Sequence, residues 1–167
     1  MVLTKEELIA SLQNETRILL HLAGKIDRSQ LDYRPTPNQR STLELLQYLS
    51  AMGPIMIAFV KAGAFDQEAW QAAISAAGRR NFDQALTALE KQRSIYGDVL
   101  QGWSDDDFRG EIEMLGRKMS RGGFIVNLVL CAHAAYRTQL FLYLKACGRD
   151  ELNTMNLWAG VDAPFAG

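Results

Sequence analysis

The chain has 167 residues, of which 48 % are hydrophobic and 22 % are charged, and its formal net charge is -1. This length and composition fit one globular domain with a sizeable core and exclude an intrinsically disordered chain. With so small a net charge, no global electrostatic field attracts the protein to nucleic acid or to an anionic membrane.

The first 26 residues predict an amphipathic helix. Thr4, followed three residues later by Glu7, has the spacing of a capping box. Apolar residues then recur at helical spacing, namely Leu8, Leu12, Leu19, Leu22 and Ile26. No basic segment followed by an apolar stretch opens the chain, so we expect no secretory signal and a cytoplasmic protein.

A second helix is predicted over residues 41–63, after a loop at 27–40 whose prolines cannot continue a helix. Ser41 and Glu44 repeat the capping-box spacing at its start. Its core stripe consists of Leu45, Leu49, Met52, Met56 and Phe59. Pro54 should kink this helix in its middle, because proline lacks the backbone donor and clashes with the preceding turn.

The middle of the chain predicts shorter elements around a third long helix. A short helix starts at Asp66, and the long helix covers about residues 82–101. Ser104 is predicted to cap one further turn. Residues 109–121 have no helical period, which favours an extended excursion or a short hairpin.

Residues 122–148 form the longest apolar run in the chain. A helix that is apolar on most of its circumference is expected to be surrounded by other elements, so this segment is predicted to be the central helix of a bundle. Cys131 and Cys147 lie about 24 Å apart on this helix, too far for a disulfide. Both are predicted to be small buried residues in a reducing compartment.

Together these segments predict an all-α fold, in which residues 1–167 form a single domain. Its architecture is expected to be an up-down-type four-helix bundle with short extra helices. The tail after Leu152 contains Trp158 and Phe165, so we expect part of the tail to pack on the bundle.

Two stretches resemble the DinB-like (DinB/YfiT) superfamily of helical bundle proteins. They are YRPTPNQRSTLELLQYLSAMG at the start of the second helix and YRTQLFLYLKACG near the end of the last one. The resemblance implies a DinB-like four-helix bundle over nearly the whole chain. It also implies a divalent metal held between helices by three histidines, one from the second helix and a His-x-x-x-His pair from the last. Activities in that family include thiol-dependent transferases and isomerases.

This chain departs from the metal motif at every ligand. The second-helix histidine position is Tyr48, and the histidine pair aligns with Ala132 and Tyr136. His133 is rotated about 100° from Ala132 around the helix, so only a local bulge or a shift in the alignment would return it to the site. We therefore expect a degenerate metal site and no cofactor. The alternative is zinc or nickel bound by a substitute set around His133.

If the bundle follows the family, Tyr48 and Tyr136 face each other where the metal would lie. The functional hypothesis is a small-molecule pocket lined by Tyr48, His133 and Tyr136, because buried phenols need hydrogen-bond partners. Arg137 or Gln139 would provide a polar anchor for the ligand. The alternative is that the tyrosines fill the vacated space and that Arg137 meets a carboxylate from another helix.

Two functions are compatible with these residues. The first is a small-molecule-binding or interaction module that lacks the metal and forms a homodimer through apolar helix faces, including Ile55, Ile57 and Phe59. The second is a metal- or thiol-dependent transferase or isomerase with an altered site around His133. Neither nucleic acid nor a membrane is expected as a partner.

Overall fold

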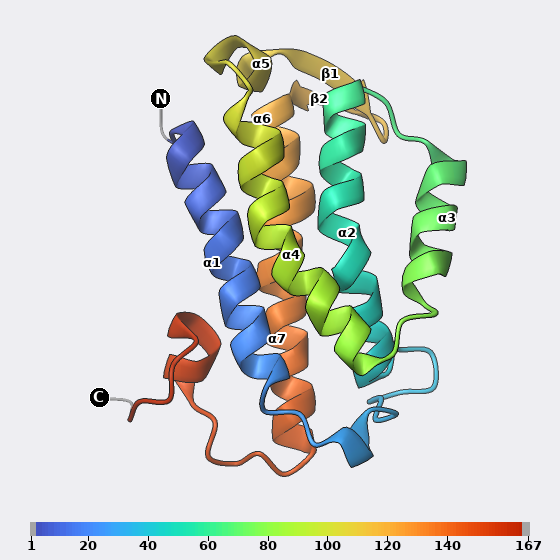
Figure 1. Ribbon diagram of the computed structural model, residues 1–167, viewed down its shortest axis with the longest axis vertical. Helices are drawn as coiled ribbons and strands as arrows, with labels where there is room; N and C mark the ends of the chain where they lie inside the picture. The colour runs from blue at the N-terminus through green and yellow to red at the C-terminus, as the bar shows by residue number, and fades with distance from the viewer. Residues whose placement is uncertain (1–2, 165–167) are drawn as a thin grey trace.

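The computed structural model describes residues 3–164 and shows an all-α bundle of four long helices (Figure 1). These are α1 (Lys5–Ala23), α2 (Thr42–Ala62), α4 (Phe82–Gln101) and a continuous last helix made of α6 (Arg121–Ile125), the π-helical turn η2 (Val126–Leu130) and α7 (Cys131–Ala146). α1 packs against α4 and α7, and α2 packs against the same two helices, so the core lies between all four. The prediction of an all-α four-helix bundle is confirmed.

Shorter elements connect the long helices. They are the 3-10 turn η1 (Arg28–Gln30), α3 (Gln67–Ala77), α5 (Asp105–Arg109), the strands β1 (Glu111–Met114) and β2 (Arg117–Ser120), and the π-helical turn η3 (Met155–Ala159). The two strands pair antiparallel, with Glu111 opposite Ser120, so the segment 109–121 contains the hairpin that was one of its two predicted forms. Leu115 and Gly116 both have positive φ in the turn, as the twist of a tight hairpin requires.

α2 and α4 run in the same direction, although they follow each other among the long helices. Gln92 of α4 lies against Leu49 of α2, and four residues further along both helices Tyr96 lies against Gly53. The parallel arrangement is possible because α3 carries the chain back along the outside of α2 before α4 begins (Figure 1). α3 therefore forms an outer layer on one side of the bundle.

The helix starts that local spacing predicts are confirmed. Thr4 and Glu7 form a capping box at α1, and Ser41 and Glu44 form one at α2, each with both hydrogen bonds present. Ser104 likewise caps α5. Each cap involves residues only three apart, so the local sequence is sufficient to identify it.

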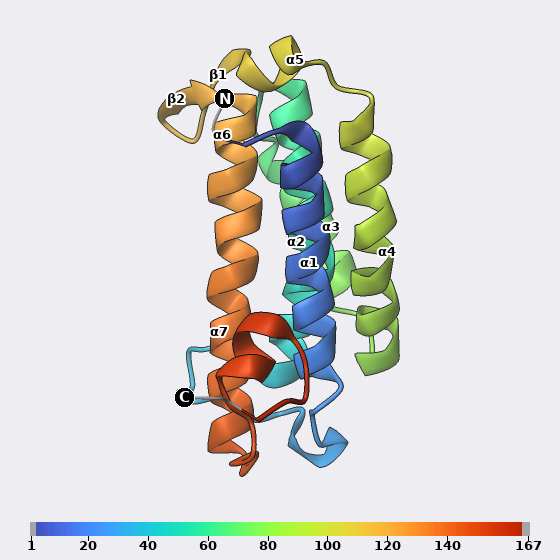
Figure 2. The ribbon, with the colours of Figure 1, turned by 90° about the vertical axis from the view of Figure 1, so that its left-hand side faces the viewer.

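The last helix lies at the side of the bundle rather than in its centre (Figure 2). By length and composition alone, Thr42–Ala62 and Arg121–Ala146 could each cross a membrane, as the core helix of a soluble protein also could. In the most apolar window of the last helix 28 % of the residues are buried, against 61 % for α2. Cys131 is exposed, Cys147 is partly buried and Leu142 is 58 % exposed. The predictions of a central helix and of two buried cysteines are therefore wrong, because this helix has one apolar face on the core and another on the surface.

The apolar residues around Pro54 are mostly core residues and not a free surface. Ile57 and Phe59 are buried, and Ile55 is partly buried. The helices of the same chain already cover the side chains of Ile57 and Phe59. The prediction that these two residues contribute to a homodimer surface is therefore wrong, and the homodimer itself stays a prediction.

The C-terminal tail packs on α1, as expected, but through other residues than expected. Arg17 of α1 donates a hydrogen bond of 3.2 Å to the carbonyl of Gly160, and Leu152 is buried in the core. Trp158 is 68 % exposed and lies against the Arg137 side chain of α7, so it contacts the surface of the bundle rather than its core. Phe165 lies outside the residues that the structure describes.

Candidate functional site

Tyr48 of α2 and Tyr136 of α7 lie in contact, as expected from the resemblance to the DinB-like motif. Their rings meet edge to face with a centroid separation of 5.3 Å. The guanidinium of Arg40 lies 3.9 Å from the centre of the Tyr48 ring, and Trp70 of α3 contacts the same ring edge to face. Burial, together with the neighbouring Tyr136 phenol, raises the pKa of Tyr48. The Tyr48 phenol therefore remains protonated at neutral pH.

His133 belongs to a buried chain of hydrogen bonds between three helices. The side chain is fully buried, and its Nε2 lies 2.9 Å from the hydroxyl of Tyr96 on α4. The Tyr96 hydroxyl donates to Gln92 Oε1 (2.8 Å), and Gln92 Nε2 donates to the carbonyl of Leu49 on α2 (2.8 Å). Because the tyrosine proton is used on Gln92, His133 must donate from Nε2 and carry no proton on Nδ1.

Two observations indicate that this series of hydrogen bonds has a structural role in the core. A Cβ atom at Gly53 would overlap the Tyr96 hydroxyl and come within 3.0 Å of His133 Nε2, so only glycine leaves room for the pair. Burial lowers the pKa of His133 to about 4, and the ring is neutral at physiological pH. The imidazole is therefore enclosed, neutral and already bonded.

Arg137 pairs with Glu15 of α1, which is the alternative considered from the sequence. Arg137 Nη1 lies 3.0 Å from the carboxylate, and the two side chains are only 7 % and 14 % exposed. Burial raises the pKa of Glu15, and the charge of Arg137 opposes that shift. The pair links α1 to α7.

The four predicted site residues thus do not surround one pocket. Tyr48 and Tyr136 meet between α2 and α7, whereas His133 turns toward α4 and Arg137 toward α1. His133 and Arg137 are four residues apart and lie close together around the helix, whereas Tyr136 and Arg137 are adjacent in sequence and point about 100° apart. The structure therefore brings the two tyrosines together and directs His133 and Arg137 to other helices.

The last helix does contain a bulge, but its position does not move His133 into the place of Ala132. The π-helical turn spans Val126–Leu130, and regular α-helix resumes at Cys131. His133 and Ala132 both follow the bulge, so their relative rotation is that of an ordinary α-helix. Within residues 3–164, no group of three or more His, Cys, Asp or Glu side chains could hold a metal ion. The residues present do not fit the three-histidine metal centre that the DinB-like resemblance implies.

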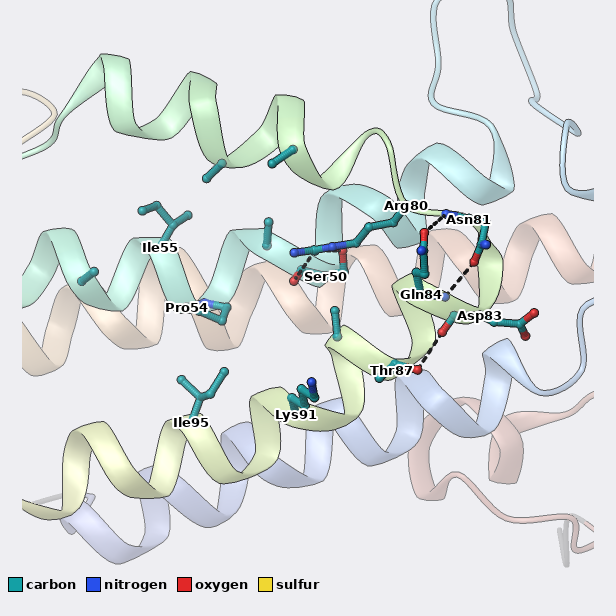
Figure 3. Close-up of a pocket in the computed structure, with 15 residues that line it drawn as sticks. Ser50, Pro54, Ile55, Arg80, Asn81, Asp83, Gln84, Thr87, Lys91 and Ile95 are labelled. Atoms are coloured by element: carbon teal, nitrogen blue, oxygen red, sulfur yellow. Dashed lines mark hydrogen bonds between the residues drawn. The ribbon is translucent and has the colours of Figure 1, made fainter.

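A groove on another side of the bundle has the size of a ligand site (Figure 3). It lies between α2, α3 and α4 and has a volume of about 810 Å³. Its apolar wall consists of Ala51, Pro54, Ile55 and Ala58 from α2, Ala73 and Ala76 from α3, and Ala88 and Ile95 from α4. α3 packs on α2, and the short side chains of the alanines leave the space toward α4 unfilled.

Polar side chains gather at one end of this groove. Arg80 Nη1 donates to the carbonyl of Ser50 (3.0 Å) and to the Ser50 hydroxyl. The Ser50 carbonyl is four residues before Pro54, whose missing N–H leaves it without the usual helical donor. Arg80 therefore replaces the backbone bond that proline removes, and its side chain is fixed across the groove as a result.

Sequence reasoning missed the groove because its lining carries no chemical signature. Its walls are alanines and single aliphatic residues from three helices, and only their arrangement in space creates a cavity. The one local signal was Pro54, since a proline inside a helix leaves a carbonyl that needs another donor. The sequence does not show that Arg80, thirty residues away, supplies it.

Comparison with known proteins supports the fold that this geometry shows. No family model matches the chain, and no curated protein matches it. A solved structure of a DinB-like protein from Bacillus cereus ATCC 10987 aligns with a TM-score of 0.70 and 16 % sequence identity, covering 89 % of this chain and 95 % of that one. The DinB-like protein YjoA of Bacillus subtilis aligns with a TM-score of 0.66 and 16 % identity, covering 87 % of this chain and 95 % of its own. The chain therefore has the DinB-like fold.

Proposed function

We propose that the protein is a binding module that lacks the catalytic metal of its fold family and holds a small, largely apolar molecule in the groove between α2, α3 and α4. The observation that carries this proposal is the groove itself. Its volume of about 810 Å³ falls within the range of about 300–1,000 Å³ that is typical of ligand sites. Apolar walls with a few polar groups at one end are the usual composition of such sites.

Binding is favoured over catalysis by the state of the reactive groups. His133 is enclosed in the core with its Nε2 bonded to Tyr96, so no substrate or metal ion reaches it, and the Tyr48 phenol is protonated at neutral pH. The groove's hydroxyls, Ser50 and Thr87, each donate to a backbone carbonyl. No histidine or cysteine of the described part of the chain lines the groove. This arrangement supports the binding reading over an altered transferase or isomerase.

Binding is tested with the neutral dye Nile red, whose fluorescence rises in apolar surroundings. We expect saturable binding to the wild type and at least a tenfold weaker affinity in Ala76→Phe, which fills the groove. Ala72→Phe is the matched control, because Ala72 is exposed on the same helix, one turn earlier, and does not line the groove. Both variants should melt cooperatively by circular dichroism. Equal affinities in the two variants, or no saturable binding, would refute the proposal.

We also propose that the protein forms a homodimer through the outward face of its last helix. Cys131, Ala135, Thr138 and Leu142 are all exposed there, and their spacing of four, three and four residues forms one straight seam. No member of this seam is charged, so the same seam of a second copy, related by a two-fold axis, is a matching partner.

Light scattering at micromolar concentration should therefore give the mass of two chains for the wild type and of one chain for Leu142→Glu. Leu115→Glu is the control, since Leu115 is an exposed leucine in the hairpin turn, away from this seam. It should remain a dimer. A wild-type monomer would contradict the proposal.

A further inference from the structure

We infer that the ligand of this groove is an amphipathic organic anion, with one carboxylate on an apolar chain of medium length. The inference rests on the proposed function and adds the chemical class of the ligand. Two observations carry it: a surplus of positive charge at the groove, and a guanidinium edge that is held in place and left without a partner.

The groove has more positive than negative charge available to a ligand. Its charged lining residues are Arg80, Asp83 and Lys91. Asp83 is already bound by Arg28, at 2.6 and 3.0 Å, and its carboxylate points away from the groove (Figure 3). Neither Arg80 nor Lys91 forms an ion pair with a carboxylate within residues 3–164. An anion is therefore the complementary ligand.

Arg80 presents the donor pair that suits a carboxylate. Its Nη1 hydrogens are directed to the two oxygens of Ser50, so the edge formed by Nε and Nη2 remains available to bind a ligand. Neither of these two atoms has a hydrogen-bond partner among the described residues. This edge of a guanidinium binds a carboxylate through two parallel hydrogen bonds.

The arginine is also held in place before any ligand arrives. Gln47 of α2 donates to the backbone carbonyl of Arg80 (2.6 Å), and Ser50 anchors the guanidinium. Both ends of the residue are therefore fixed to α2. A fixed donor loses little conformational entropy on binding, which favours affinity.

The remainder of the groove fits an apolar chain. Ile55 and Ile95 lie at the end opposite Arg80, with Pro54 between them and Lys91 nearer the middle (Figure 3). From Ser50, where the guanidinium is anchored, to Ala58 the eight residues of α2 extend about 12 Å. A chain of about ten carbons, such as that of decanoate, suits this length.

The test is calorimetric titration at pH 7 with decanoate, with neutral decanamide and with the cation decyltrimethylammonium. We expect decanoate to bind at least tenfold more tightly than either of the other two and to displace Nile red from the wild type. Lys91→Gln should weaken decanoate binding about threefold to tenfold and leave decanamide binding unchanged. Arg93→Gln is the control, because it removes the same charge from the same helix outside the groove.

Arg80→Lys separates charge from shape, since it keeps the charge and loses the two-donor edge. We expect it to weaken decanoate binding tenfold or more, with a cooperative melt that shows the fold is kept. Decanamide binding as tight as decanoate binding, or equal losses in Lys91→Gln and Arg93→Gln, would overturn the anion inference while leaving the binding module intact. If none of the probes, Nile red included, binds in an Ala76→Phe-sensitive way, the proposed function itself fails.

Discussion

Acidification should destabilise the protein through His133. The folded-state pKa of this imidazole is lowered to about 4, whereas its ordinary value is 6.5. As the pH falls below 6.5, the imidazole of His133 therefore becomes protonated in the unfolded chain while it stays neutral in the folded chain. The stability that His133 contributes is complete above about pH 6.5 and is lost as the pH falls toward 4.

The size of the effect follows from the two pKa values. At about pH 5 the unfolded imidazole is almost fully protonated and the folded one is about one-tenth protonated. The free energy of unfolding should then be lower than at pH 7 by about 2 kcal/mol, and the full loss at still lower pH is about 3 kcal/mol. These values apply to a fully buried side chain, which solvent does not screen.

Urea unfolding of the wild type, His133→Gln and His21→Gln at about pH 7 and about pH 5 measures this pH-dependent loss of stability. Glutamine can still donate a hydrogen bond to Tyr96 but does not titrate, so the decrease in stability from pH 7 to pH 5 should be about 2 kcal/mol smaller in His133→Gln than in the wild type. His21→Gln should stay closer to the wild type, because His21 is only partly buried. A parallel decrease in the wild type and His133→Gln, or a folded-state His133 that titrates near pH 6.5 by NMR, would refute the reasoning.

Further substitutions test the hydrogen bonds of Tyr96 and the buried ion pair between Glu15 and Arg137. Gly53→Ala should lower the free energy of unfolding by about 2 kcal/mol, because its methyl group overlaps the Tyr96 hydroxyl. Gly97→Ala is the control, because a methyl group has room there, and it should raise the free energy of unfolding by up to about 1 kcal/mol in the same urea series. Tyr96→Phe should cost about 1–3 kcal/mol in urea unfolding, since it leaves buried polar atoms without a partner, and an unchanged midpoint would show that the hydroxyl contributes nothing. Glu15→Gln should destabilise by about 3 kcal/mol or more by leaving the buried charge of Arg137 unpaired, and adding Arg137→Met should recover most of that loss in a double-mutant cycle.

The parts of the fold that depend on neighbouring residues could be predicted from the sequence. The capping boxes at Thr4 and Ser41 involve positions three apart, and the long helices follow from a periodicity that is visible within each segment. The hairpin was one of two options for a segment without helical period. In these places local preference and final structure agree.

The contact of Tyr48 with Tyr136 was expected from the family resemblance, but the partners of His133 could not be predicted, because they depend on which helix faces which. His133 meets Tyr96, 37 residues earlier in the chain, and no pattern in either segment identifies the other as its partner. The outward position of Leu142 was hidden for the same reason, since apolar composition does not tell which face the rest of the chain covers. The groove could not be predicted because it forms where side chains are small, and alanines in a sequence do not indicate whether a neighbouring helix fills the space beside them.

Pro54 has a consequence for how this protein can evolve. An alanine at this position would restore the backbone hydrogen bond to Ser50 and stabilise α2, since proline is the least favourable residue inside a helix. The same change would make the bond from Arg80 to that carbonyl redundant and allow its side chain to move. If the groove binds the proposed ligand, selection for thermal stability alone would favour variants that bind it less well. A proline kept at this place would mark a function that opposes stability.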